Sequence, residues 1–307
     1  MKKNGDPAKL YLMKKSGPNH RIHFLIFLVL LSFFSIISDS ASNETPSPYR
    51  SLIQRLSQDG FDSEFVSNLL TDTRAELNPF VLMLYLKLHS RETTELYSKF
   101  TTPETILLSK KFLRQNLKTL KMMENRYQVD KEVAVAILLV ESRFGEHIGK
   151  YRVIPTFASM AIMDSPESLQ KNFQVLKDTN PDLSYESVEG FAKRRASWAY
   201  EELKCFLKIV QYEKMDPLEV YGSYAGAFGM PQFIPSSYLV YAYSKKGLEN
   251  WLLNKEEAIF SIGNYLKSHG WEKNLPIEKK KKVLWTYNHS EPYVETILQL
   301  AQKIKKR

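Results

Sequence analysis

The sequence has almost no cysteine. Cys205 is the only one in 307 residues, so an internal disulfide is excluded. It lies in an apolar helical pattern with Phe206, Leu207 and Val210, where we expect a buried thiol that acts as a small apolar side chain. Without disulfides the fold depends on its core, and the chain is long enough for one elaborated domain of roughly 250 residues.

Motifs for binding nucleic acids or nucleotides are also missing. The sequence shows no Cys/His spacing typical of zinc modules and no Gly-Lys-Thr phosphate loop, so we expect no nucleic-acid partner and no cofactor. The net charge of +9 divides into +4 for residues 1–40 and +5 for the remainder. This mild basicity is compatible with an anionic cell wall or membrane surface, but does not require one.

The most apolar stretch near the amino terminus is too short to span a bilayer. Phe24–Ile37 is uncharged and follows basic residues, and its length of about 14 residues is below the roughly 20 of a membrane-spanning helix. The pattern predicts a signal peptide over residues 1–40 and a linker over 41–48. Small residues offer cleavage sites after Ser40 and Ser42.

Two alternatives stay open for this leader. It acts as a membrane tether only if it is left uncleaved, and Met13 in place of Met1 would give a leader of conventional length. No cysteine lies in the residues directly after the apolar stretch, where a lipid would be attached, so the protein is not expected to be a lipoprotein. In either case the sequence predicts export, with the folded part in the periplasm.

Helical spacing of apolar residues dominates the rest of the chain. Besides the segment discussed next, it predicts helices over Tyr49–Leu56, Ser63–Leu70, Ile106–Tyr127, Ser197–Tyr212 and Lys255–His269. Thr102-Pro103-Glu104 is typical of a helix start. Strand patterns are few and short, so we expect a mainly α fold with at most a small β element.

One apolar run ends in a carboxylate. Residues 133–140 are uncharged and Glu141 follows directly. A buried strand would also fit, but Asp130 as an N-cap and Gly145 as a stop favour a helix. In its last turn, burial and the helix dipole would both raise the pKa of Glu141, which suits a general acid near neutral pH. The alternative is a glutamate that faces water at the helix end.

Two segments break the helical pattern and are rich in aromatic and amide side chains. Tyr221–Tyr238 contains three unevenly spaced glycines, which fit neither a dinucleotide fingerprint nor a phosphate loop. Trp285–Tyr293 has a similar composition. Aromatic faces can stack on sugar rings, and amides can pair with hydroxyl or N-acetyl groups. Each segment is therefore either part of a sugar site or a packed structural turn.

Together these segments resemble lytic transglycosylases of the membrane-bound B type. The resemblance lies in three site motifs, which are Glu141–Gly145, Gly222–Gly229 running into Pro231–Tyr238, and Tyr287-Asn288 followed by Tyr293. Supporting matches are Asp59–Asp62, Phe100–Pro103 and Asn264–Trp271. It covers nearly all of the exported chain, roughly Tyr49 to Leu300.

The resemblance implies a lysozyme-like core with extra helices. It places a catalytic domain over residues 49–302, in which a helical part, 49–120, packs on a core of 121–302. It also implies a monomeric enzyme that cleaves the β-1,4 bond between N-acetylmuramic acid and N-acetylglucosamine in peptidoglycan glycan strands. Glu141 occupies the position of the family's sole catalytic acid and base. The family's substrate-binding positions are matched by Ser223, Gln232, Phe233, Tyr287, Asn288 and Tyr293.

A single carboxylate is enough for this chemistry. Ordinary glycosidases use two, whereas in a lytic transglycosylase the C6 hydroxyl of the muramoyl group attacks its own C1 and a 1,6-anhydro sugar forms. Two alternatives remain, a muramidase that hydrolyses the same bond and a non-catalytic scaffold that binds peptidoglycan. Some members carry an acidic calcium loop, but here Tyr243–Asn250 has lysines where carboxylates would be needed, so no metal site is predicted.

Overall fold

The computed structural model describes residues 47–84 and 94–306. The predicted signal peptide and residues 41–46 of the predicted linker lie outside them. The prediction of a mainly α fold is confirmed, since the described sheet is a single antiparallel pair, β1 (Tyr151–Arg152) with β2 (Tyr221–Gly222). Within the described ranges, no helix combines the length and apolarity that crossing a membrane would take.

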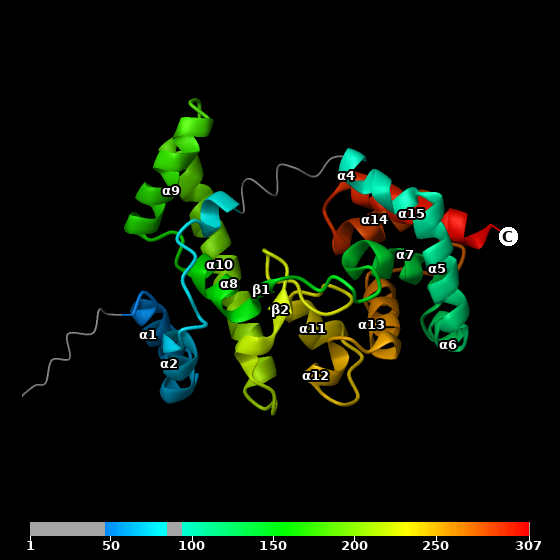
Figure 1. Cartoon of the computed structure of the whole chain (residues 1–307), viewed down its shortest axis with the longest axis horizontal. Coiled ribbons are helices and arrows are strands. Elements are labelled where there is room, and N and C mark those ends of the chain that lie inside the picture. Colours follow the sequence, from blue (N-terminus) through cyan, green and yellow to red (C-terminus); the bar gives the residue numbers. More distant parts are fainter. Residues whose placement is uncertain (1–46, 85–93, 307) are drawn as a thin grey trace, which may run out of the picture. The chain divides into compact units, whose positions relative to one another are not determined.

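Helices follow one another along the chain (Figure 1). The first are α1 (Arg50–Gln58), α2 (Ser63–Thr71), α4 (Thr94–Ser98), the 3-10 helix η1 (Lys99–Thr101), α5 (Pro103–Gln115), α6 (Leu117–Tyr127), α7 (Lys131–Ser142) and α8 (Val153–Ala161). The later ones are α9 (Pro166–Thr179), α10 (Tyr185–Val210), the 3-10 helix η2 (Pro217–Glu219), α11 (Pro235–Tyr241), α12 (Leu248–Trp251), α13 (Lys255–Ser268), α14 (Ile277–Tyr287) and α15 (Glu291–Lys305).

Several predicted helix starts are confirmed by their caps. The carboxylate of Asp62 accepts a hydrogen bond of 2.7 Å from the amide of Phe65 at the start of α2. Thr102 caps α5, whose first residue is Pro103. These contacts satisfy amide groups that have no partner inside the helix.

The predicted long helix Ile106–Tyr127 is wrong, because the chain is broken between α5 and α6. The break falls at Asn116, whose backbone leaves the helical region and whose side-chain amide donates to the carbonyl of Phe112 at 2.9 Å. Asparagine competes for backbone groups in this way, which makes it a poor residue for a helix interior. Apolar spacing continues through the break and therefore hides it.

Two other predicted boundaries are also corrected. Helix α10 starts at Tyr185, well before Ser197, because Ser184 caps it by accepting from the amide of Ser187 at 3.2 Å. The segment Trp285–Tyr293 is mostly helical, since α14 and α15 leave only residues 288–290 between them. Cys205 on α10 was expected to be buried but is only half-buried. The burial that it has raises the pKa of its thiol, which makes the thiol less reactive.

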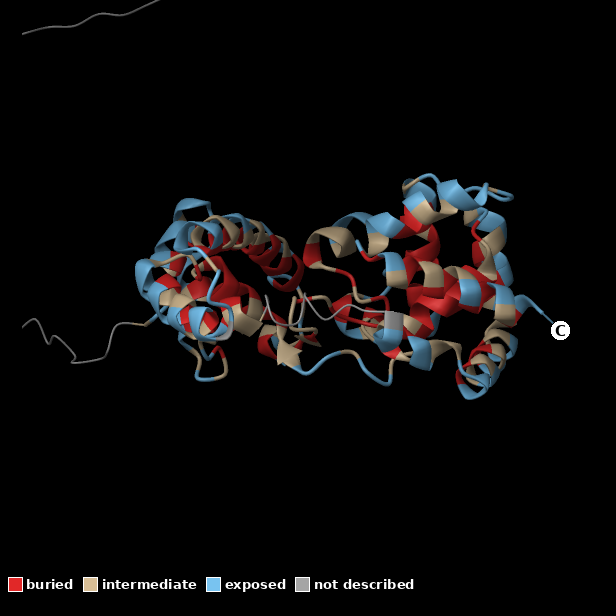
Figure 2. Cartoon of the chain, turned by 90° about the horizontal axis from the view of Figure 1, so that it is seen from above, coloured by how far each residue is buried: buried red, intermediate tan, exposed pale blue. Residues whose placement is uncertain are grey.

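Helix α7 lies in the core, and the helical prediction for it is confirmed. Residues 133–139 are all buried, and α7 packs against α15, α5, α13 and α6 (Figure 1). In Figure 2, buried residues lie toward the interior of the helices and exposed residues toward the outside. A helix that is apolar on every side must be buried on every side. Glu141, two residues after this buried run, therefore projects from a helix whose position is fixed by packing.

Candidate active site

Glu141 is the last residue but one of α7, as predicted, and is half-buried. The helix ends at Ser142, so Gly145 is not its stop. Asp130 occupies the N-cap position but makes no cap hydrogen bond with its side chain. Its carboxylate instead forms an ion pair of 2.8 Å with the Nζ of Lys280, which ties the start of α7 to α14.

The turn after Glu141 has an unusual backbone. Arg143, Phe144 and Gly145 follow one another with φ of 50°, 62° and 94°, a region that costs non-glycine residues free energy. Two contacts offset this cost. The ring of Phe144 stacks on Phe112 with centroids 4.1 Å apart, and the Ser142 hydroxyl accepts from the amide of Gly145 at 3.1 Å. The turn is thus held in one conformation beside Glu141.

The sheet brings the two predicted site motifs together. Strand β1 follows this turn, and β2 ends directly before Ser223. The side-chain Nε2 of Gln232 joins the same two segments, because it donates to the carbonyls of Ile148 at 3.1 Å and Gly229 at 2.8 Å. Gln232 itself has a φ of 53°. In this structure the glutamine therefore acts as a brace between the loops.

Tyr293 on α15 contacts Glu141 directly. Its phenolic Oη donates a hydrogen bond of 2.7 Å to Oε1 of Glu141. The ring is 1% exposed. Burial first, and the charge of Glu141 second, raise the pKa of Tyr293 well above its ordinary value. The phenol therefore stays protonated near neutral pH and remains a donor to the carboxylate.

Tyr287 at the end of α14 links Glu141 to the glycine loop. Its ring is parallel to that of Tyr293, with centroids 6.4 Å apart, and its Oη donates to the carbonyl of Pro231 at 2.6 Å. Its pKa is also raised well above the ordinary value, mainly by burial and then by the charge of Glu141. Pro231 directly precedes Gln232, so the two tyrosines connect Glu141 with the loop that carries the glutamine.

Ser223 closes a tight turn at the start of the glycine loop. Its Oγ accepts from the amides of Ala225 at 3.2 Å and Ala227 at 3.1 Å, and its own amide donates to the carbonyl of Ala227 at 2.7 Å. A hydroxyl that accepts two bonds still has its hydrogen to donate. The loop geometry thus leaves Ser223 able to serve as a hydrogen-bond donor.

Two glycines of this loop are required by close packing. A Cβ at Gly226 would lie 2.3 Å from the ring of Phe157, and a Cβ at Gly229 would lie 2.4 Å from the ring of Trp251. Both glycines also have positive φ. This part of the loop is therefore a tightly packed turn, and its contact with a sugar stays a prediction.

Phe233 and Asn288 lie in different surroundings. Phe233 is 2% exposed and packs against Trp251, Tyr265 and Tyr287, so its ring has no free face for a sugar in this structure. Direct contact with a sugar through Phe233 or the equally buried Tyr293 stays a prediction. Asn288 is half-buried, and its side-chain amide forms no hydrogen bond with any described residue, so it is available to a ligand.

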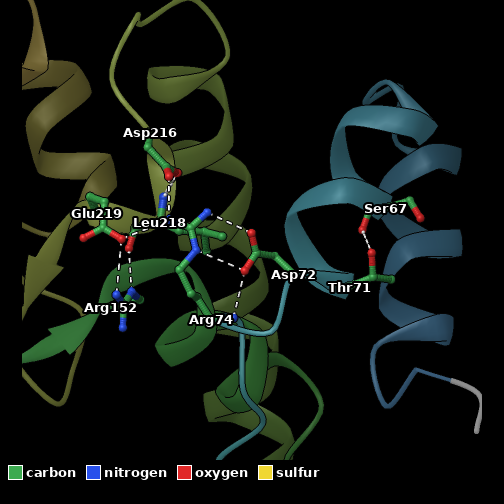
Figure 3. Close-up of polar contacts among 8 residues, drawn as sticks. All are labelled: Ser67, Thr71, Asp72, Arg74, Arg152, Asp216, Leu218 and Glu219. Atoms are coloured by element: carbon green, nitrogen blue, oxygen red, sulfur yellow. Dashed lines mark hydrogen bonds and ion pairs between the residues drawn. The ribbon is translucent and has the colours of Figure 1, made fainter.

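A cluster of charged residues, which the sequence analysis missed, anchors the chain before Ser223 (Figure 3). Nη1 of Arg74 contacts the carboxylates of Asp216 at 2.5 Å and Glu219 at 2.9 Å, and its Nη2 contacts Asp72 at 2.8 Å. Arg152 of β1 also contacts Glu219, at 3.2 Å. Asp216 also caps η2, because its side chain accepts from the amide of Leu218 at 3.0 Å. The cluster joins residues far apart in sequence, so no local pattern shows it.

A cavity of about 600 Å³ opens elsewhere, at the start of α7. Its lining includes Asp130 and Glu132, which precede Glu141 by 11 and 9 residues and so lie roughly 14–17 Å along the helix from it. Of the three lysines that line it, two already pair with carboxylates, Lys280 with Asp130 and Lys281 with Glu295, and the third is Lys305. Neither its place nor its charges connect it with Glu141.

Comparison with known proteins gives consistent matches. Residues 45–281 match the family described as Transglycosylase SLT domain. Membrane-bound lytic murein transglycosylase B of Escherichia coli (strain K12) is 34% identical over 177 residues, which are 57% of this chain and 41% of that protein. The alignment thus spans about two fifths of the length of this curated relative.

Solved structures have the same fold. Soluble lytic transglycosylase SltB1 from Pseudomonas aeruginosa matches with a TM-score of 0.64 and 24% identity over 83% of this chain and 97% of its own. SltB3 from the same organism, solved with NAG-anhNAM-pentapeptide, matches with a TM-score of 0.63 and 20% identity over 84% of this chain and 78% of its own. The predicted lysozyme-like, mainly helical fold is therefore confirmed.

Proposed function

The chain belongs to the Transglycosylase SLT domain family, and we propose that it is an exported peptidoglycan lytic transglycosylase with Glu141 as its single acid and base. The observation that carries the proposal is the position of Glu141. It lies at the end of a buried helix, accepts a hydrogen bond from a buried tyrosine, and is followed by a turn braced to the glycine loop. We also propose that residues 49–302 form the catalytic domain, with 49–120 packed on 121–302.

The reaction needs two proton transfers at one carboxyl group. Protonated Glu141 gives its proton to the glycosidic oxygen as the bond from C1 of N-acetylmuramic acid breaks. The carboxylate then takes the proton of the muramoyl C6 hydroxyl as that oxygen bonds to C1. Atoms balance without water, and the product is a 1,6-anhydro sugar. Because the nucleophile belongs to the substrate, proximity offsets several kcal/mol of the barrier.

Tyr293 is proposed as the residue that orients Glu141. A hydrogen bond from its phenol to Oε1 fixes the position of the Glu141 carboxyl group. The same bond stabilises the carboxylate that forms after the first transfer. Tyr293, which the resemblance matches to a sugar subsite, thus has a second role as a hydrogen-bond donor to the catalytic Glu141.

The substrate is proposed to be a peptidoglycan glycan strand. The amide of Asn288 and the hydroxyl of Ser223 would bind its polar groups, and Tyr287 would lie under the sugar beside the scissile bond. Gln232 and Phe233 would support these residues, Gln232 through its bonds to Ile148 and Gly229. SltB3, which shares the fold, is a protein solved with a glycan–peptide fragment, and this supports the same class of ligand here.

Product mass tests the reaction type. Purified protein incubated with peptidoglycan sacculi should release muropeptides that end in 1,6-anhydro-N-acetylmuramic acid. A muramidase would instead release products heavier by one water with a free reducing end. A binding scaffold would release neither, although it would pellet with the sacculi. Either of the last two results would contradict the proposed reaction.

A periplasmic location is the finer part of the proposal. Residues 1–40 are proposed to be a cleaved signal peptide, with cleavage after Ser40 or Ser42. Mass spectrometry of the protein isolated from the extracytoplasmic fraction should therefore give a chain that begins at Ala41 or Asn43. An intact leader in the membrane fraction would show instead that it serves as an anchor.

A further inference from the structure

One face of α14 carries lysines that have no acidic partner. The helix has four consecutive lysines. Two of them are paired, Lys280 with Asp130 at 2.8 Å and Lys281 with Glu295 at 2.6 Å. Lys279 and Lys282 are exposed and form no ion pair within the described part of the chain. Their positive charges therefore face solvent.

The same helix also exposes a tryptophan. Trp285 is 40% exposed, and its ring meets His289 edge-on at a centroid distance of 5.6 Å. Lys282 lies three residues before Trp285, so on a helix the two side chains are neighbours. Part of the apolar indole face is therefore in contact with solvent, next to an unpaired lysine.

We propose that Lys279, Lys282, Trp285 and His289 form a second peptidoglycan-binding surface, outside the catalytic site, for glycan strands that carry acidic stem peptides. This inference rests on the proposed function. The lysines complement the carboxylates of the stem peptides. The indole face offers an apolar surface on which a pyranose ring can stack, and the imidazole holds the indole from its edge.

The position of this surface gives it a role with polymeric substrate. Trp285 and His289 flank Tyr287 and Asn288, the proposed sugar-binding pair, at the junction of α14 and α15. Tyr287 points into the protein, toward Pro231, whereas Trp285 is exposed. A strand held at Trp285 therefore remains outside the reacting centre. The surface would raise the local concentration of sacculus around the site without taking part in bond cleavage.

The test compares Lys282→Glu/Trp285→Ala with wild type in two assays. The first measures the fraction of protein that pellets with sacculi at low and high salt. The second measures turnover of sacculi against turnover of a short soluble tetrasaccharide. We expect sacculus affinity to fall by roughly tenfold at low salt, with less effect at high salt because the charges are screened. Turnover of the tetrasaccharide should stay at the wild-type rate.

A matched control is Lys121→Glu/Met122→Ala on α6, which changes an exposed lysine and an exposed apolar side chain on another helix. It should pellet like wild type. Equal pelleting of wild type and the α14 variant would overturn the inference, as would an equal loss in the control. Wild-type turnover of the tetrasaccharide shows that the α14 variant is folded. Failure of the proposed function would appear separately, as absence of turnover by wild type itself.

Discussion

The environment of the Glu141 carboxyl group depends more on its neighbours than on its own burial. It is half-buried, and the phenol of Tyr293 donates to it from a position that has almost no contact with water. A donor to a carboxylate favours the ionised form, whereas burial favours the neutral one. The two effects oppose each other, and such a balance can keep a carboxyl group able both to give and to take a proton.

Replacing Tyr293 with Phe removes this donor and keeps the ring. We expect turnover of sacculi to fall by roughly 10- to 100-fold, the usual worth of a hydrogen bond to a charged group. Without the donor the ionised form of Glu141 is less favoured, so the decline of activity on the alkaline side should move to higher pH. Rates measured across pH 4–9 test both expectations.

Tyr265→Phe is the matched control for this change. It removes a buried phenol that donates to the carbonyl of Thr286 at 2.6 Å and contacts Tyr287 only through its ring. It should lower stability without moving the pH profile. A Tyr293→Phe enzyme with an unchanged rate and profile would show that the hydrogen bond to Glu141 has no part in the reaction.

Gln232 supports the site through its amide nitrogen. Gln232→Glu replaces that donor with an oxygen, which leaves the carbonyls of Ile148 and Gly229 facing a carboxylate. We expect the free energy of unfolding to fall by about 2 kcal/mol, together with a loss of turnover. Urea unfolding measures the first. Equal stability of the variant and wild type would contradict the bracing role.

At the residue scale, the sequence alone could predict some features of the site and not others. The apolar run before Glu141 places that carboxylate correctly, because burial of a helix follows from its composition. The hydrogen bond from Tyr293 joins residues 152 positions apart, and no local pattern contains such a contact. Family resemblance matched Tyr293 to a subsite but did not give its bond to Glu141.

At the scale of elements, the segments near the site are held by two different means. Helix α7 is held by apolar packing on every side, whereas η2 and the start of β2 are held by the Arg74 cluster. The burial of α7 was predictable from sequence, because a continuous apolar run indicates a core segment. The Arg74 cluster and the break at Asn116 were not predictable, because the partners of charged and amide side chains are determined only in the folded chain.

The Arg74 cluster makes the free energy of unfolding depend on pH in the acidic range. Hydrogen bonds from Arg74 lower the pKa of Asp72 to about 2 and the pKa of Asp216 below its usual value. Arg152, followed by Arg74, lowers the pKa of Glu219. Groups with a lowered folded pKa stabilise the fold above their unfolded pKa values of about 3.9–4.3. That contribution is lost as the pH falls toward 2.

Arg74→Met should therefore reduce the dependence of stability on pH between about 4 and 2. Urea midpoints at pH 7, 4 and 2.5 measure it. Lys193→Met is the control, since it breaks an exposed pair with Glu189 on α10 and should leave the dependence as in wild type. If Arg74→Met loses as much stability in acid as wild type does, the cluster has no such role.

At the scale of the whole molecule, the fold class and the order of the site motifs were predictable. Helical spacing and three motifs in family order indicated a lysozyme-like enzyme, and the match to SltB1 confirms that fold. Helix boundaries were less predictable, as α10 and the helices flanking Asn288 show. They depend on caps such as Ser184, whose effect becomes visible only when the next turn forms.

The most direct measurement is the rate at which Glu141→Gln releases muropeptides from sacculi. The amide has the shape of the carboxyl group and can still accept from Tyr293, but it can neither give nor take the proton. We predict a loss on the order of 10³-fold or more, with thermal unfolding and sacculus pelleting as in wild type. A variant that releases anhydro-muropeptides at the wild-type rate would contradict the assignment of Glu141 as the acid and base.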